Sequence, residues 1–312
     1  MPILRLCADD NGLFLYRSPA AALPVLCTAA RGNGPIIIMI HGYKYDPSVT
    51  LRDPHTSIFA MRACANQTNG ALWPRHLGFG IGNPKEGLAI AFGWRAKGTI
   101  WQAQQSARAT AHCLERVIRT LNDVSPNKPI HIIAHSMGSE LVFETIKRLP
   151  ADSVERVVIL TGASYVSHVI GAMQSPAGMT CELFNVTSRE NDLFDFVFER
   201  LVPPVSLTDH VMGLGVTLPN VANLQLDCDQ TLSLLANFGA KISASESRVC
   251  HWSGYTRPGA LEFFAQIMRC PEKSPMTVMK ALLPKDTDPR WSRFGIKAGS
   301  KPLLSPRRKT AS

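Results

Sequence analysis

A serine hydroxyl becomes a catalytic nucleophile when a sharp turn presents it and a neighbouring base removes its proton. Ser136 lies at the centre of the motif AHSMG, residues 134–138. The apolar residues 130–133 predict a buried strand before the motif, and residues 139–149 predict a helix after it. Strand, tight turn with a central serine and helix form the context of a nucleophile elbow. The sequence therefore predicts Ser136 as a nucleophile, against the alternative that it only caps a helix.

An acyl-transfer site also needs N–H donors for the oxygen that becomes negative in the transition state. The turn at Ser136 points the Met137 N–H at that position. A second donor is expected from the loop after the apolar run 36–40, where His41 and Gly42 follow directly. Because Gly42 has no side chain, its backbone or that of Tyr43 can approach a substrate oxygen. We therefore predict an oxyanion hole built from Met137, Gly42 and Tyr43.

The base is sought among the histidines that follow the elbow helix, which are His168, His210 and His251. His251 lies after the last predicted strand and before the final helix. Enzymes with a nucleophile elbow place their base at this position. It is the predicted general base. His210, in a loop rich in proline and glycine, is the reserve candidate. The alternative for His251 is a half-buried structural histidine beside Trp252.

A carboxylate is expected to fix the tautomer of the base. Asp192 and Asp195 both follow the predicted strand 181–186. Asp192 lies closer to the end of that strand, whereas Asp195 lies one turn into the next helix. We therefore predict Asp192 as the third member of the triad, with Asp195 as the alternative.

Other residues near these motifs are weaker candidates. His41, Tyr45, His135 and Trp252 are predicted to line the substrate pocket. The loops 66–86 and 202–220 are predicted to shape it. His131 and His135 have the four-residue spacing of a zinc helix, but they lie on a strand with no glutamate between them. We expect neither a metal nor a cofactor.

Composition limits the alternatives. The 312 residues carry a net charge of +9, of which residues 271–312 hold +7 and residues 1–270 only +2. A nucleic-acid-binding role for the whole chain is therefore poorly supported, although the basic tail could contact anionic lipid or nucleic acid. Eight scattered cysteines, no predicted signal peptide and no apolar run of membrane-spanning length predict a cytoplasmic protein. We expect one domain over 1–270 and a basic, mobile tail over 271–312.

Strands and helices alternate along the chain. Strands are predicted at 2–7, 13–17, 24–28, 36–40, 88–92, 130–133, 156–160, 181–186 and 221–226. Helices are predicted at 57–65, 99–121, 139–149, 164–173, 193–201, 230–236 and 259–269. This alternation predicts an α/β fold with a mostly parallel central sheet flanked by helices. In such sheets the candidate residues converge beyond the carboxyl ends of the strands.

The strings HGY, AHSMG, VTSRENDLFD and HWSGYTRPG together resemble the α/β-hydrolase superfamily across roughly residues 30–270. They are similar in particular to a bacterial branch known only as α/β-hydrolases of unknown function. The resemblance implies a serine hydrolase acting on carboxylic esters through an acyl-enzyme. Ala134 replaces the first glycine of the elbow, as in lipase-like members. The alternatives are an acyltransferase with the same triad, a catalytically idle binding protein, or a carrier for the basic tail.

Overall fold

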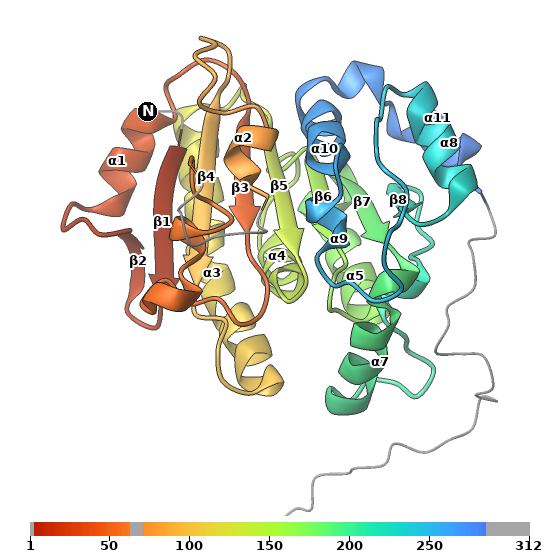
Figure 1. Ribbon diagram of the computed structural model, residues 1–312. Coiled ribbons are helices and arrows are strands. Elements are labelled where there is room, and N and C mark those ends of the chain that lie inside the picture. The colour runs from red at the N-terminus through yellow and green to blue at the C-terminus, as the bar shows by residue number, and fades with distance from the viewer. Residues whose placement is uncertain (1–2, 63–70, 285–312) are drawn as a thin grey trace, which may run out of the picture.

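A mostly parallel eight-stranded sheet forms the centre of the protein (Figure 1). The computed structural model describes residues 3–62 and 71–284. The strand order is β2-β1-β4-β3-β5-β6-β7-β8, and only β2 pairs antiparallel to its neighbour. The strands are β1 (Ile3–Asp9), β2 (Gly12–Leu15), β3 (Ile36–Ile40), β4 (Leu88–Trp94), β5 (Ile130–His135), β6 (Arg156–Leu160), β7 (Glu182–Thr187) and β8 (Val221–Gln225). The predicted fold class is confirmed.

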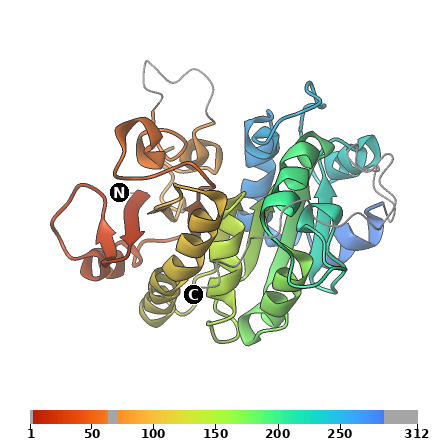
Figure 2. The same cartoon turned by 90° about the horizontal axis from the view of Figure 1, so that it is seen from below.

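Helices cover both faces of the sheet, as the view from below makes clear (Figure 2). One side holds α1 (Ala22–Ala29), α3 (Ile100–Val124), α4 (Gly138–Ile146), α5 (Val166–Met173) and α6 (Pro176–Thr180). The other holds α2 (Trp73–His76), α8 (Asp229–Asn237), α9 (Ser253–Thr256), α10 (Ala260–Arg269) and α11 (Met276–Leu282). α7 (Asp192–Leu201) follows β7 at the carboxyl end of the sheet. Short 3₁₀ helices are η1 (Thr50–Arg52), η2 (Pro54–Thr56), η3 (Arg189–Asn191), η4 (Met212–Leu214) and η5 (Pro271–Lys273).

Burial on both faces explains why the central strands are apolar without alternation. In β3, Ile36, Ile38 and Ile40 pack into the core on the α3 side. Ile37 and Met39 pack into the core on the α10 side. The sheet is thus the shared wall of two cores, and its central strands are held rigidly at the level of the candidate site. Within the described residues, no helix combines the length and apolarity needed to cross a membrane.

Two predicted elements are wrong, and a third differs only in its first residue. Residues 24–28, predicted as a strand, lie in helix α1, whose first turn tolerates Pro24. The predicted helix 57–65 is absent from residues 57–62, which follow η2 as turns, while residues 63–65 lie outside the described part. The last long helix begins at Ala260, because Gly259 occupies its N-cap position with a φ of +82°.

The folded part also extends beyond the boundary expected at residue 270. Residues 271–284 form η5 and α11, and α11 buries Met276 and Met279 against the core on the α10 side. The Lys280 ammonium donates to the carbonyl of Pro219 at 3.1 Å. The expectation of a mobile tail is therefore wrong for this segment, because its methionines supply an apolar face. Residues 285–312, which carry most of the tail's positive charge, lie outside the described residues.

Replacement of Met279 tests whether α11 is part of the folded domain. Met279 is fully buried, whereas Val278 on the same helix is about half exposed. Met279→Ala should lower the free energy of unfolding by about 2–3 kcal/mol, because it removes buried methylenes and leaves a cavity. Val278→Ala, the matched control, should change it by less than about 0.5 kcal/mol. Urea denaturation measures both values. Equal, small effects of the two variants would contradict the packing of α11.

Candidate active site

Ser136 is held in a strained turn between β5 and α4. Its φ of +52° lies in the left-handed region that residues with side chains rarely adopt. The Ser136 N–H donates to Leu160 O at 3.0 Å. Its carbonyl accepts from the Ser139 hydroxyl at 2.8 Å and from the Ala163 N–H at 3.2 Å. The predicted strand–turn–helix geometry is present, and these bonds fix the serine in it.

Two glycines give this turn its space. A Cβ atom on Gly138 would lie 2.7 Å from the carbonyl oxygen of His41, so a larger residue would push the elbow away from β3. A Cβ atom on Gly42 would lie 2.7 Å from Ser136 Cβ. The backbone of Gly42 is therefore in contact with the predicted nucleophile, and both small residues are required by close approach rather than by flexibility.

His251 lies beside Ser136, as the sequence predicted. Its Nε2 is 2.8 Å from Ser136 Oγ, and its Nδ1 is 2.6 Å from the side-chain oxygen of Asn191. A side-chain amide oxygen accepts a hydrogen bond but cannot donate one. His251 Nδ1 therefore carries the proton, which leaves Nε2 free to accept the proton of the Ser136 hydroxyl. This is the tautomer that a general base for serine requires.

The third group of this arrangement corrects the sequence prediction. Asn191, not Asp192, is bonded to the His251 ring. β7 continues to Thr187, and η3 then turns the chain so that Asn191 is the residue facing the histidine. Asp192, the next residue, is rotated by about 100° around the helix axis. Asp195 follows Asn191 by one helical turn, and its carboxylate accepts from the Asn191 amide at 3.0 Å.

The backbone and ring of His251 are tied to three elements. Its carbonyl accepts from His135 Nε2 at 3.0 Å and from the Thr161 hydroxyl at 3.2 Å. The Phe194 ring stacks on the imidazole with centroids 4.6 Å apart. The ends of β5 and β6 and the first turn of α7 thus hold the base. The orientation of His251 is set by the sheet, although the residue lies in a loop.

A buried ion pair anchors the segment that carries His251. Glu190 and Arg257 face each other with both side chains almost inaccessible to solvent. Glu190 also accepts from the Ser245 hydroxyl at 2.7 Å, and its carbonyl accepts from the Cys250 N–H at 2.9 Å. One residue beside Asn191 therefore contacts the chain on both sides of His251. The role of Glu190 could not be predicted from the sequence, because an acid in a motif does not reveal a distant arginine partner.

His41 positions the predicted oxyanion loop and does not line a pocket. It is fully buried and stacks on Trp94 with an interplanar angle of 5°. The Trp94 backbone N–H donates to His41 Nε2 at 3.0 Å, so Nδ1 carries the proton and donates to Gly42 O at 3.0 Å. The pKa of His41 is lowered to about 4, mainly by burial and further by the nearby His135. The ring therefore stays neutral. This bond fixes the peptide unit between Gly42 and Tyr43.

The other predicted pocket residues have mixed positions. His135 is buried, and its ring is bonded to the carbonyl oxygen of His251. The Tyr43 hydroxyl donates to Gly98 O at 2.6 Å. Both side chains thus stabilise the backbone around the site. Tyr45 is partly buried beside His41, with ring centroids 5.3 Å apart. Trp252 is half exposed next to Phe194, at a centroid distance of 6.3 Å. Among these four predicted pocket residues, Trp252 has the largest exposed fraction, about half.

The loops expected to shape the pocket contribute mainly to the core. Trp73, Leu77 and Phe79 are fully buried among the residues packed on the α10 side. Val211 and Met212 are buried on the α3 side. These apolar side chains therefore stabilise the domain instead of facing a substrate. Residues 66–70 of the first loop lie outside the described part.

The pKa of His251 lies well below the ordinary value for histidine. Burial is the main cause, and repulsion by His135 and by the Lys44 ammonium adds to it. Neutral His251 is thus the form present at neutral pH. A base must be unprotonated to accept the Ser136 proton, so this shift favours the reactive state.

A charged network lies beneath the elbow helix. Glu140, in the first turn of α4, is almost completely buried. It accepts from Arg108 Nε at 2.9 Å and from His168 Nδ1 at 3.0 Å. His168 Nε2 lies 2.8 Å from Glu144. Burial alone would lower the pKa of His168, but its bonds to Glu140 and Glu144 outweigh this and raise it. His168, one of the base candidates, is therefore a structural cation.

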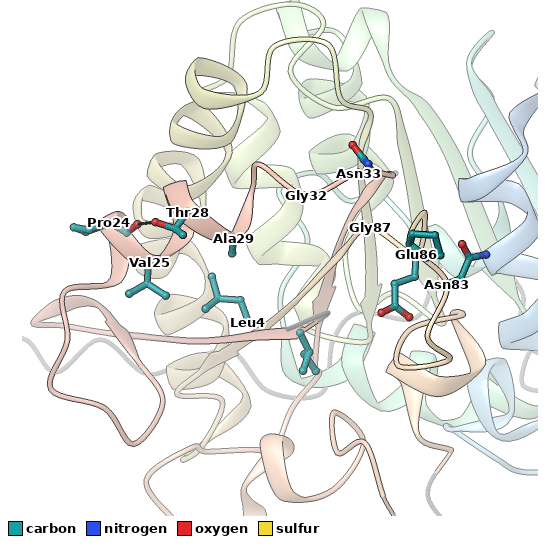
Figure 3. A pocket seen from close by; sticks show the side chains of 12 residues that line it. Leu4, Pro24, Val25, Thr28, Ala29, Gly32, Asn33, Asn83, Glu86 and Gly87 are labelled. Atoms are coloured by element: carbon teal, nitrogen blue, oxygen red, sulfur yellow. Dashed lines mark hydrogen bonds between the residues drawn. The ribbon is translucent and has the colours of Figure 1, made fainter.

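A separate cavity of about 820 Å³ lies at the opposite end of the sheet (Figure 3). Its lining includes Leu4 of β1, Val25 of α1 and Gly87, which precedes β4. Figure 3 shows Leu4, Val25 and Ala29 on one side and the polar residues Asn83 and Glu86 on the other. Since Ser136 follows the carboxyl end of β5, this cavity does not belong to the candidate site.

The described residues contain no group of three or more histidine, cysteine, aspartate or glutamate side chains placed to hold a metal ion. The two histidines with zinc-like spacing have separate surroundings. His135 is bonded to His251 O. Both ring nitrogens of the buried His131, in contrast, have no hydrogen-bond partner among the residues that the structure describes. Burial, with Arg156 and Arg269 nearby, lowers the pKa of His131 to about 3.

The fold and the elbow agree with the comparison to known families. Residues 26–174 match the family model described as "Alpha/beta hydrolase of unknown function (DUF900)". These residues, just under half of the chain, are similar to α/β-hydrolases of that family. The matched segment includes residues 41–43 and Ser136, while Asn191 and His251 lie beyond it. The superfamily predicted from the sequence is confirmed.

Solved structures add a weaker likeness. One similar chain is a Trichoderma reesei cutinase in complex with a C11Y4 phosphonate inhibitor, at 11% identity and a TM-score of 0.25. The match covers 53% of this chain and 73% of the cutinase chain. A likeness of this size supports no inference about individual residues. The search of curated proteins found no matching sequence.

Replacement of His168 tests the charged network under the elbow. His168→Ala leaves Glu140 and Glu144 without the cation between them, and should lower the free energy of unfolding at pH 6 by about 3 kcal/mol. Because the pKa of His168 is raised in the folded protein, protonation of its ring adds to the free energy of unfolding. This contribution is complete below the unfolded-state pKa near 6.5, and it is lost as the pH rises through the folded-state pKa. The difference between variant and wild type should therefore shrink at pH 9.5.

Urea denaturation at pH 6 and pH 9.5 measures this difference. His112→Ala is the matched control, because His112 is exposed on α3. The control should change stability by less than about 0.5 kcal/mol at either pH. A loss in His168→Ala that is the same at both pH values would show that packing, and not charge, accounts for the effect.

Proposed function

We propose that this α/β-hydrolase is a serine hydrolase that cleaves carboxylic esters through Ser136, His251 and Asn191. The observation that carries the proposal is the 2.8 Å separation between His251 Nε2 and Ser136 Oγ. The 2.6 Å bond from His251 Nδ1 to Asn191 supports it, because it sets the tautomer needed for proton removal. The neutral state of His251, favoured by its lowered pKa, fits the same role.

In the proposed reaction, Ser136 Oγ attacks the ester carbonyl carbon while its proton passes to His251 Nε2. The carbonyl oxygen becomes negative in the resulting tetrahedral intermediate. His251 then returns the proton to the departing alkoxide, and the C–O bond breaks to leave an acyl-serine and an alcohol. A water molecule gives a proton to His251 and attacks the acyl group. In the collapse of the second intermediate, the bond between the acyl carbon and Ser136 Oγ breaks, His251 returns its proton to Oγ, and the acid leaves.

The negative oxygen would be stabilised from two sides. Met137 is the N-cap of α4, so its N–H lies at the positive end of the helix dipole beside Ser136. On the other side, Gly42 contacts Ser136 closely enough that no Cβ atom fits between them. His41 holds the Gly42 carbonyl, which leaves the N–H of the same peptide unit, on Tyr43, directed away from His41. We therefore assign the Met137 and Tyr43 N–H groups as donors.

Exposed apolar side chains next to the base favour an ester with an apolar part. Phe194 stacks on His251, and the half-exposed Trp252 packs beside Phe194. Leu193 and Val197, one turn apart on α7, are also about half exposed. Such a surface gains free energy when an acyl or alcohol chain covers it, by about 25 cal/mol per Å² of apolar area.

Replacement of Ser136 tests the proposal. Hydrolysis of p-nitrophenyl butyrate by Ser136→Ala should fall by about ten-thousand-fold or more in kcat, because only binding and the oxyanion hole remain. The fold should be retained, since the turn is held by backbone groups and by Ser139.

The matched control is Ser167→Ala on α5, where the serine is exposed. It should hydrolyse the ester at the wild-type rate, and circular dichroism should show unchanged folding of both variants. Wild-type turnover in Ser136→Ala would refute the proposed nucleophile. Absence of ester hydrolysis in the wild-type protein would refute the proposed substrate class.

A further inference from the structure

Asp195 is a buried acid that is bonded to Asn191, the residue whose side-chain oxygen contacts the His251 ring. It lies on α7 four residues after Asn191, and both side chains are almost completely buried. Asp195 Oδ1 accepts from Asn191 Nδ2 at 3.0 Å, while Asn191 Oδ1 lies 2.6 Å from His251 Nδ1. Ser136, His251, Asn191 and Asp195 therefore form one continuous chain of hydrogen bonds.

The carboxylate decides which way the Asn191 amide points. An ionised carboxylate only accepts hydrogen bonds, so the NH₂ end of the amide must face Asp195. The oxygen end then faces His251, and the imidazole proton must be on Nδ1. If the amide were rotated by 180°, its NH₂ group would donate to Nδ1 and the proton would move to Nε2. Nε2 would then be unable to accept the proton of Ser136.

The position of Asp195 on α7 suits an acidic side chain. The residue lies in the first turn of α7, where the partial positive charge of the helix N-terminus stabilises an anion. A negative charge behind Asn191 also attracts the imidazolium that forms when His251 takes up a proton. Asn191 alone, which is neutral, supplies the orientation but not this charge.

We propose that Asp195 is a positioning residue that selects the reactive tautomer of His251 through the Asn191 amide and supplies the negative charge of the triad. The inference rests on the proposed function of Ser136 and His251. Asn191 and Asp195, one helical turn apart, share the roles that a single aspartate has in a Ser-His-Asp triad. Asp195 thereby affects the reaction without touching the substrate or the reacting atoms.

The first arm of the experiment compares two acids on the same helical turn. Asp195→Asn should lower kcat/KM for p-nitrophenyl butyrate by about ten- to a hundred-fold at neutral pH, the size typical of groups that orient a functional histidine. Loss of the charge should also lower the pKa of His251 and shift the acid limb of the pH profile to lower pH. Asp192→Asn, the matched control, should stay within about three-fold and leave the limb unchanged.

The second arm is the exchange variant Asn191→Asp/Asp195→Asn. It places a carboxylate directly on His251 Nδ1, with an amide behind it to donate. This variant should recover most of the activity that Asp195→Asn loses, because the two groups keep their bond with the roles reversed. Asn191→Asp alone should be destabilised, since two buried carboxylates would face each other. Thermal unfolding of each variant separates this effect from catalysis.

The third arm does not depend on activity. ¹⁵N NMR of the His251 ring should show a protonated Nδ1 in the wild type and a mixture containing protonated Nε2 in Asp195→Asn. A wild-type profile and an unchanged tautomer in Asp195→Asn would overturn the role of Asp195, even if Ser136 proves essential. A tautomer shift without ester hydrolysis in any variant would instead refute the proposed function and leave the role of Asp195 intact.

Discussion

The left-handed backbone of Ser136 is the constraint on which the rest of the site depends. A φ of +52° at a residue with a Cβ atom costs of order 1–3 kcal/mol, which the surrounding structure must offset. Bonds from Ser139 and Ala163 to the Ser136 carbonyl hold the turn. The glycine positions 42 and 138 allow the oxyanion loop and β3 to approach it. The strained turn therefore restricts which residue types fit at positions 42 and 138.

The remaining groups are fixed by buried polar contacts rather than by apolar packing alone. His41 is held by Trp94 on one ring nitrogen and holds Gly42 with the other. The loop of His251 is tied by the pair of Glu190 and Arg257. Removing one partner of such a buried pair leaves an uncompensated charge, which costs more than the pair itself contributes. These contacts explain how loops can hold a site to the precision that proton transfer needs.

The sequence predicted most of the sheet, because its central strands are continuous apolar runs bounded by turns. Local signals also indicated Ser136, Gly42 and His251, which lie close together in the structure. Residues 24–28 were misassigned, since a short apolar run does not distinguish a strand from a buried helix. The predicted domain boundary at residue 270 was too early. The basic charge of the following segment favoured a mobile tail, although two methionines of α11 are buried.

The side chain that bonds the His251 ring was missed for a chemical reason. A carboxylate was predicted at this position, although an amide oxygen can accept the same bond from His251. The spacing of Asn191 and Asp195, one helical turn apart, was visible in the sequence. What was not visible is that η3 rotates Asn191, rather than Asp192, toward the histidine. Such a rotation of one residue depends on where β7 ends and where α7 begins.

Covalent labelling tests the central claim most directly. A fluorophosphonate reacts with a serine hydroxyl only when a neighbouring base and an oxyanion hole activate it. The account predicts one adduct per chain, located at Ser136 by peptide mass spectrometry and lost in His251→Ala. A protein that is folded but unlabelled, or labelled at another serine, would contradict it.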